Sequence, residues 1–162
     1  MQAKKIVTEI NEIVGSCADE KLGRVVSKMR IQPRKNQTSY RDELSSLINN
    51  FEMDTVEIGI FQFLAQYEVT PKYMLFGKIE MDYLATDRNS KEIVLLDHDD
   101  TEYVMLRCAT NSDAYLAFLN IYSKYIISDL CDHFDYVVPE RESLYNLCGG
   151  LDYKSFVDFC FD

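Results

Sequence analysis

The clearest pattern of hydrophobic and polar positions lies between residues 73 and 109. Apolar segments of strand length alternate there with short polar links whose Asn, Ser and Asp residues favour turns. Gly77 interrupts the first segment, and a glycine inside a strand often marks a bulge or a close approach of another backbone. The pattern predicts an antiparallel meander with strands at Tyr73–Ile79, Tyr83–Asp87, Ile93–Asp97 and Tyr103–Ala109.

Helical periodicity follows the meander. Thr110 and Asp113 have the spacing of a capping box at a helix start. Apolar residues then recur at helical intervals as far as residue 127, at Tyr115, Phe118, Leu119, Tyr122 and Ile126. We expect a helix over residues 112–127 that packs its apolar stripe on the sheet.

The first 51 residues also have helical periodicity. Apolar stripes predict helices at Lys4–Val14 and Asp19–Ile31, and a third at Tyr40–Asn50 that Ser39 caps. A polar, turn-prone linker, Gln32–Ser39, separates the second helix from the third.

Two further regions complete the expected fold. Alternation predicts a strand at Val56–Phe61, and the bulky residues after it predict a short helical connection at Gln62–Tyr67. Pro139 and the Gly149-Gly150 pair bracket a helix in the tail, and a last short helix is expected at Tyr153–Phe161. We therefore predict a single α+β domain over residues 1–162. Its parts are a helical part (1–51), an antiparallel sheet of about four to six strands plus the packed helix (55–127), and a helical tail (128–162).

Several segments of the central region together resemble the C-terminal half of the SUKH superfamily, the Smi1/Knr4-like group. They are Phe76-Gly77, Tyr83–Asp87, Glu92–Asp97, and the Asn111-Ser112-Asp113 helix start that leads to Phe118-Leu119. The turn at Asn89-Ser90-Lys91 lacks the glycine that members of the superfamily often place there.

Many SUKH proteins are immunity proteins of bacterial polymorphic toxin systems. The resemblance therefore implies a non-catalytic protein that neutralises a cognate toxin, for example a nuclease, by masking its active or substrate-binding surface. A regulatory or scaffold module, or a viral antagonist, that binds host proteins is the alternative that the same superfamily implies.

The charge distribution bears on the kind of partner. The formal net charge is −10, but residues 1–50 carry +3 and residues 51–162 carry −13. An acidic body repels a phosphate backbone, which disfavours direct binding of nucleic acid. The same charge favours encounter with a basic protein, such as a basic toxin domain.

Acidic and aromatic residues gather at the ends of the predicted strands. Aromatic rings flanked by charges are typical of protein-binding surfaces. The alternative is that the acids are solvated strand ends and the tyrosines half-bury in the core. We predict the following partner-binding residues: Asp82, Tyr83, Asp87, Asp97, Asp99, Asp100, Glu102 and Tyr103.

The sequence contains few residues suited to catalysis or metal binding. It has two histidines. His98 lies in an acidic segment that lacks the glycine and spacing of an EF-hand loop. His133 and Cys131 could be two zinc ligands, but the sequence has no second clustered pair to complete the four that zinc needs. Phosphate-binding, dinucleotide-binding and hydrolase motifs are absent. We predict no enzymatic activity, no metal and no cofactor, with an unrecognised site around His98 or His133 as the alternative.

Cysteine spacing and hydropathy suggest a compartment. The five cysteines are odd in number and widely spaced, which predicts reduced thiols in a cytosolic protein: Cys17, Cys108, Cys131, Cys148 and Cys160. No apolar run is long enough to cross a bilayer, so we expect a cytoplasmic protein without membrane attachment. A small basic cluster is either a solvated loop or a phosphate or RNA patch: Arg30, Arg34, Lys35 and Arg41.

Overall fold

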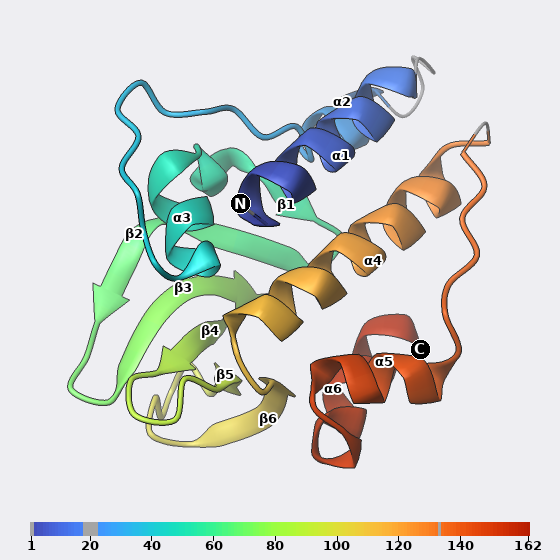
Figure 1. The fold of residues 1–162 in the computed structure, drawn as a ribbon. Coiled ribbons are helices and arrows are strands. Elements are labelled where there is room, and N and C mark those ends of the chain that lie inside the picture. Colours follow the sequence, from blue (N-terminus) through green and yellow to red (C-terminus); the bar gives the residue numbers. More distant parts are fainter. Residues whose placement is uncertain (1, 18–22, 133) are drawn as a thin grey trace.

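Six antiparallel strands in chain order form one sheet, and helices pack on it, as the α+β prediction requires (Figure 1). This computed structural model describes residues 2–17, 23–132 and 134–162. The strands are β1 (Glu57–Ile58), β2 (Phe61–Val69), β3 (Tyr73–Ile79), β4 (Asp82–Asp87), β5 (Ile93–Leu96) and β6 (Val104–Ala109). The helices are α1 (Gln2–Ser16), α2 (Gly23–Ser27), α3 (Glu43–Asn50), α4 (Ser112–Leu130), α5 (Arg141–Cys148) and α6 (Lys154–Phe161), with short 3₁₀ turns η1 (Met53–Thr55) and η2 (Leu151–Tyr153).

Gly77 lies at an irregularity of β3, as its position in the sequence predicts. The register of β3 against β4 shifts between Leu75 and Gly77. A Cβ atom on residue 77 would lie 2.6 Å from the Gln62 carbonyl oxygen of β2. Both expectations for this glycine, a bulge and a close backbone approach, are confirmed.

The helical connection predicted at Gln62–Tyr67 is wrong, because those residues belong to the nine-residue strand β2. Gly59, at φ 57°, lies in the two-residue turn that reverses the chain from β1 into β2. Phe61 and Phe63 are both buried on the helix side of the sheet, while Leu64 packs on the other side. The large apolar residues of β2 therefore point to both faces of the sheet, so the sequence does not show the alternation of apolar and polar residues that is typical of a strand.

The helices cover one face of the sheet and form the main core with it. Phe61 of β2 lies at its centre, with ring centroids 5.0 Å from Tyr122 of α4 and 6.2 Å from Phe156 of α6. Residues that alternate with the core residues of β3, β4 and β5 form a smaller apolar cluster on the opposite face: Tyr73, Leu75, Ala85, Val94 and Leu96. Within the described residues, no helix combines the length and apolar character needed to cross a bilayer.

Helices α1 and α4 lie side by side (Figure 1). Glu9 accepts hydrogen bonds from Lys124 at 2.8 Å and from Asn120 at 3.0 Å. A disulfide between Cys17 and Cys131 joins their C-terminal ends. The prediction that all five cysteines are reduced is therefore wrong for this pair, because the fold brings together two cysteines that are 114 residues apart. Cys108, Cys148 and Cys160 are free and buried.

Helix boundaries differ in detail from those predicted. The N-cap of α3 is Asp42 rather than Ser39, and the N-cap of α4 is Asn111 rather than Thr110. The N-terminal part of the predicted Asp19–Ile31 helix lies outside the described residues, and the helix that follows is only Gly23–Ser27. The Gly149-Gly150 pair ends α5, as predicted, and both glycines have positive φ angles.

Candidate functional site

Most of the predicted partner-binding residues lie at one end of the sheet. Asp82 begins β4 opposite Ile79, and the pairing of Tyr83 with Leu96 brings the β5–β6 loop to the same end. That loop spans residues 97–103. We use the name acidic rim for Asp82 together with five residues of the loop: Asp97, Asp99, Asp100, Glu102 and Tyr103.

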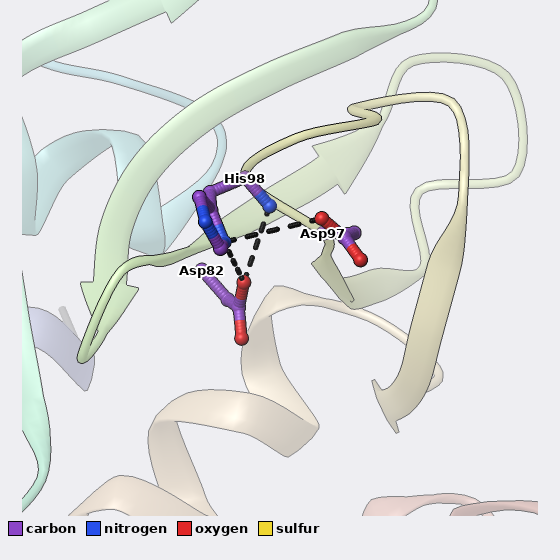
Figure 2. Close-up of side chains that lie close together, drawn as sticks. All are labelled: Asp82, Asp97 and His98. Atoms are coloured by element: carbon purple, nitrogen blue, oxygen red, sulfur yellow. Dashed lines mark hydrogen bonds and ion pairs between the residues drawn. The ribbon is translucent and has the colours of Figure 1, made fainter.

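A histidine holds the two parts of the acidic rim together (Figure 2). The Nδ1 atom of His98 lies 2.9 Å from Oδ1 of Asp82, and the backbone N–H of His98 donates to the same oxygen at 3.1 Å. Asp97 Oδ1 is 3.9 Å from Nδ1, and Asp99 Oδ1 is 3.5 Å from Nε2. The His98 side chain therefore lies among three carboxylates.

This environment favours the charged imidazolium. The hydrogen bond to Asp82 raises the pKa of His98 above its ordinary value, and the negative charges of Asp99, Asp82 and Asp97 act in the same direction. The positive ring offsets part of the repulsion among the carboxylates that it joins.

Two acids of the rim hold the loop in shape. Asp97 Oδ1 accepts the backbone N–H of Asp99 at 2.7 Å, and Asp100 Oδ1 accepts that of Glu102 at 3.1 Å. The Tyr103 N–H donates to the Asp100 carbonyl at 2.8 Å. Aspartates commonly stabilise turns in this way, so Asp97 and Asp100 have a structural role whatever else they contact.

Three other side chains of the loop are largely exposed. The Asp99 side chain is 87% exposed, Glu102 is exposed, and the Tyr103 residue is 60% exposed. Met81, in the turn beside Asp82, is 63% exposed. A partner that covers this end of the sheet would bury apolar surface from Tyr103 and Met81 between charged groups.

Two of the predicted residues have different surroundings. Asp87 is at the opposite end of β4 from Asp82, where it accepts the backbone N–H groups of Asn89 and Ser90 at 2.8 and 3.0 Å. Hydrogen bonds from Ser90 and Asn89 lower the pKa of its carboxyl group. Tyr83 is half-buried against the smaller apolar cluster, with the Lys78 ammonium 4.8 Å above its ring. The fold does not bring Asp87 to the acidic rim.

Two groups of residues could be considered as metal ligands, one around His98 and one around Cys131. One ligand atom each from Asp82, Asp97 and His98 lies within 4.8 Å of the others, a spacing that three ligands of one ion would have. The His98–Asp82 hydrogen bond already occupies Nδ1, and exposed acidic groups are often found together without an ion. In the second cluster, Cys131 is bonded to Cys17 and is no longer a thiolate ligand, while His133 lies outside the described residues.

The basic cluster does not form one patch of free cations. Arg34 donates to the backbone carbonyls of Phe51 and Ala65 at 2.9 and 2.7 Å, so its guanidinium ties the linker to β2. Arg41 instead lines a cavity of about 400 Å³. Five stretches of the chain between residues 41 and 113 form that cavity, and no pattern in the sequence indicated it.

Comparisons with family models, with curated proteins and with solved structures found no match for this chain. The resemblance to the SUKH superfamily rests on the residue patterns of the central region alone.

Proposed function

We propose that this chain is a non-catalytic binding protein whose acidic rim docks on a positively charged surface of another protein. The observation that carries the proposal is the position of the rim at one end of the sheet, where Tyr103, 60% exposed, lies in the same loop as Asp99, Asp100 and Glu102. Such a surface combines apolar area for affinity with charge for orientation.

The overall charge supports a basic partner. With a net charge of −10, the protein attracts cationic surfaces from a distance, and this attraction raises association rates at low ionic strength. Exposed rim charges contribute little affinity singly, because solvent screens them. We expect Tyr103 to contribute more of the affinity and the carboxylates more of the rate.

The state of two buried thiols argues against cysteine-based catalysis. Burial raises the pKa of Cys148 to about 12, and burial likewise raises that of Cys108 well above its ordinary value. A nucleophilic cysteine needs a thiolate, and these thiols stay protonated at neutral pH.

The resemblance to SUKH proteins suggests which partner to test first. Immunity proteins of that superfamily neutralise toxins, and the nucleic-acid cleft of a nuclease toxin is basic. The rim carboxylates would take the place of the phosphates in such a cleft. A regulatory module that binds a host protein would use the same surface, and a toxin gene directly beside the gene for this chain would favour the immunity function.

A growth assay tests the proposal. The chain is co-expressed with the toxin domain encoded beside it, as the wild type and as the triple variant Asp99→Asn, Glu102→Gln, Tyr103→Ala. These side chains project into solvent, and Asp97 and Asp100, which hold the loop, are left intact. We expect the wild type to protect the cells and the rim variant to fail.

The matched control removes the same groups elsewhere on the surface. Glu52, Asp54 and Tyr40 are exposed and lie outside the rim, so the variant Glu52→Gln, Asp54→Asn, Tyr40→Ala should still protect. Equal protection by the rim variant and the control, at equal levels of folded protein, would rule out the acidic rim as the docking surface.

A further inference from the structure

The cavity that Arg41 lines lies between the N-terminal ends of two helices and the sheet. Its walls come from the start of α3, from β2, β3, β4 and the turn after β4, and from the start of α4. The two helices begin near one another on the same side of the sheet (Figure 1). A volume of about 400 Å³ is within the range of about 300 to 1,000 Å³ that small-molecule sites occupy.

Three cationic side chains line this cavity without a carboxylate partner. Arg41, Arg88 and Lys91 form no ion pair within the described part of the chain. Arg88 Nη1 donates to the Thr70 and Pro71 carbonyls at 3.1 and 3.2 Å. These bonds anchor its guanidinium through one nitrogen. Lys91 Nζ donates to the Arg88 carbonyl at 2.6 Å, which uses one of the three donors of that ammonium.

The carboxylates in the same lining are mostly engaged elsewhere. Asp42 caps α3, where it accepts the backbone N–H and the hydroxyl of Ser45, both at 2.7 Å. Glu43 accepts the backbone N–H of Ala3 at 2.9 Å. Asp113, in the first turn of α4, is the remaining acid. The free hydrogen-bonding capacity of the cavity is therefore mainly that of donors.

An apolar wall completes the cavity. Met74 of β3 and the ring of Tyr67 of β2 contribute to the lining. Burial, together with the negative charge of Asp42, raises the pKa of Tyr67 above its ordinary value, despite a long contact of 3.4 Å with the Ser45 hydroxyl. The Tyr67 hydroxyl is thus protonated and is a further donor. The first turns of α3 and α4 add a favourable dipole for a negative charge.

We propose that this cavity binds a small organic oxyanion, a phosphate or a carboxylate carried on an apolar body. Arg41, Arg88 and Lys91 hold the anionic group, and Tyr67 and Met74 contact the apolar part. Thr86 near the end of β4 and Arg88 in the turn after it lie at the opposite end of that strand from Asp82, so this site is separate from the acidic rim. Neither proposal depends on the other.

Isothermal titration calorimetry with two probes tests the site and identifies the anionic group. Phenyl phosphate and benzoate carry the two kinds of oxyanion on the same ring, and benzyl alcohol is the neutral control. We expect at least one of the anions to bind, benzyl alcohol not to bind measurably, and added NaCl to weaken the binding by screening. Failure of both anions to bind, or equal binding of the alcohol, would overturn the proposal.

Variants assign the binding to this cavity. Arg41→Gln with Lys91→Gln should weaken binding roughly tenfold, the effect of losing charge-assisted hydrogen bonds to the ligand. Arg24→Gln with Arg30→Gln makes the same change in net charge at exposed positions outside the cavity and should leave the affinity within about twofold. Equal weakening by the two double variants would overturn the proposed location.

A third variant should change the affinity for the anion in the opposite direction. Asp113→Asn removes the remaining acid of the lining and should tighten binding of the anion. Unchanged or weaker binding by this variant would contradict the electrostatic basis of the site.

Discussion

A single carboxylate oxygen of Asp82 accepts both the backbone N–H of His98, at 3.1 Å, and a contact from its ring Nδ1, at 2.9 Å. The start of β4 and the β5–β6 loop are thereby held together at one point (Figure 2). Because Asp99 and Tyr103 follow His98 in the same loop, this contact helps to fix the surface that we propose as the docking site.

The His98–Asp82 contact predicts a pH dependence of stability. The pKa of His98 is raised in the folded state, so its contribution is complete below the unfolded-state pKa of about 6.5 and is lost as the pH rises through the folded-state pKa. The melting temperature of the wild type should exceed that of His98→Asn by more at about pH 5.5 than at about pH 8.5. A difference that is constant, or that widens at alkaline pH, would contradict this role of His98.

The disulfide between Cys17 and Cys131 predicts a redox-dependent stability. It closes a loop of 114 residues, so under oxidising conditions Cys17→Ser should lower the free energy of unfolding by roughly 2–4 kcal/mol. Dithiothreitol should lower the melting temperature of the wild type and leave that of Cys17→Ser unchanged. Peptide mapping without reduction would refute the disulfide if the peptides of Cys17 and Cys131 were recovered separately.

Two glycines should respond in opposite directions to the same substitution. At Gly77 a Cβ would lie 2.6 Å from the Gln62 carbonyl, so Gly77→Ala should destabilise the fold by about 1–3 kcal/mol. Gly15 is within α1, and a Cβ atom added there would meet nothing within 4 Å. Gly15→Ala should therefore stabilise the protein by about 0.5–1 kcal/mol in chemical denaturation. Equal effects at the two positions would refute the close packing at Gly77.

The start of α3 can be tested at two neighbouring polar residues. Asp42 accepts two hydrogen bonds from Ser45, so Asp42→Ala should cost about 1 kcal/mol of unfolding free energy. Ser39 is exposed and precedes the helix, and Ser39→Ala should change stability by less than about 0.5 kcal/mol. If urea denaturation showed a larger loss of unfolding free energy for Ser39→Ala than for Asp42→Ala, Ser39 would be the N-cap of α3 instead.

Local patterns were sufficient to predict the meander and the helix after it. Turn-forming residues precede β3 at Thr70-Pro71 and follow β4 at Asn89-Ser90, and Gly77 indicated its own irregularity. Prediction failed for Gln62–Tyr67, where β2 has apolar residues on both faces, and at the helix starts, where several capping residues lie close together in the sequence.

Features that depend on distant residues could not be predicted. The Cys17–Cys131 disulfide follows from the side-by-side packing of α1 and α4. The cavity joins Arg41 with Arg88 and Asp113, which no sequence spacing connects. Strand order explains the candidate site, because it brings Asp82 to the β5–β6 loop and moves Asp87 away from it.

The dissociation constant between the purified chain and the cognate toxin domain of the proposed immunity function tests the acidic rim most directly. We expect the variant Asp99→Asn, Glu102→Gln, Tyr103→Ala to bind at least about tenfold more weakly than the wild type, and wild-type association to slow as NaCl is raised. The control Glu52→Gln, Asp54→Asn, Tyr40→Ala should bind as the wild type does. Equal dissociation constants for the rim and control variants would contradict the account.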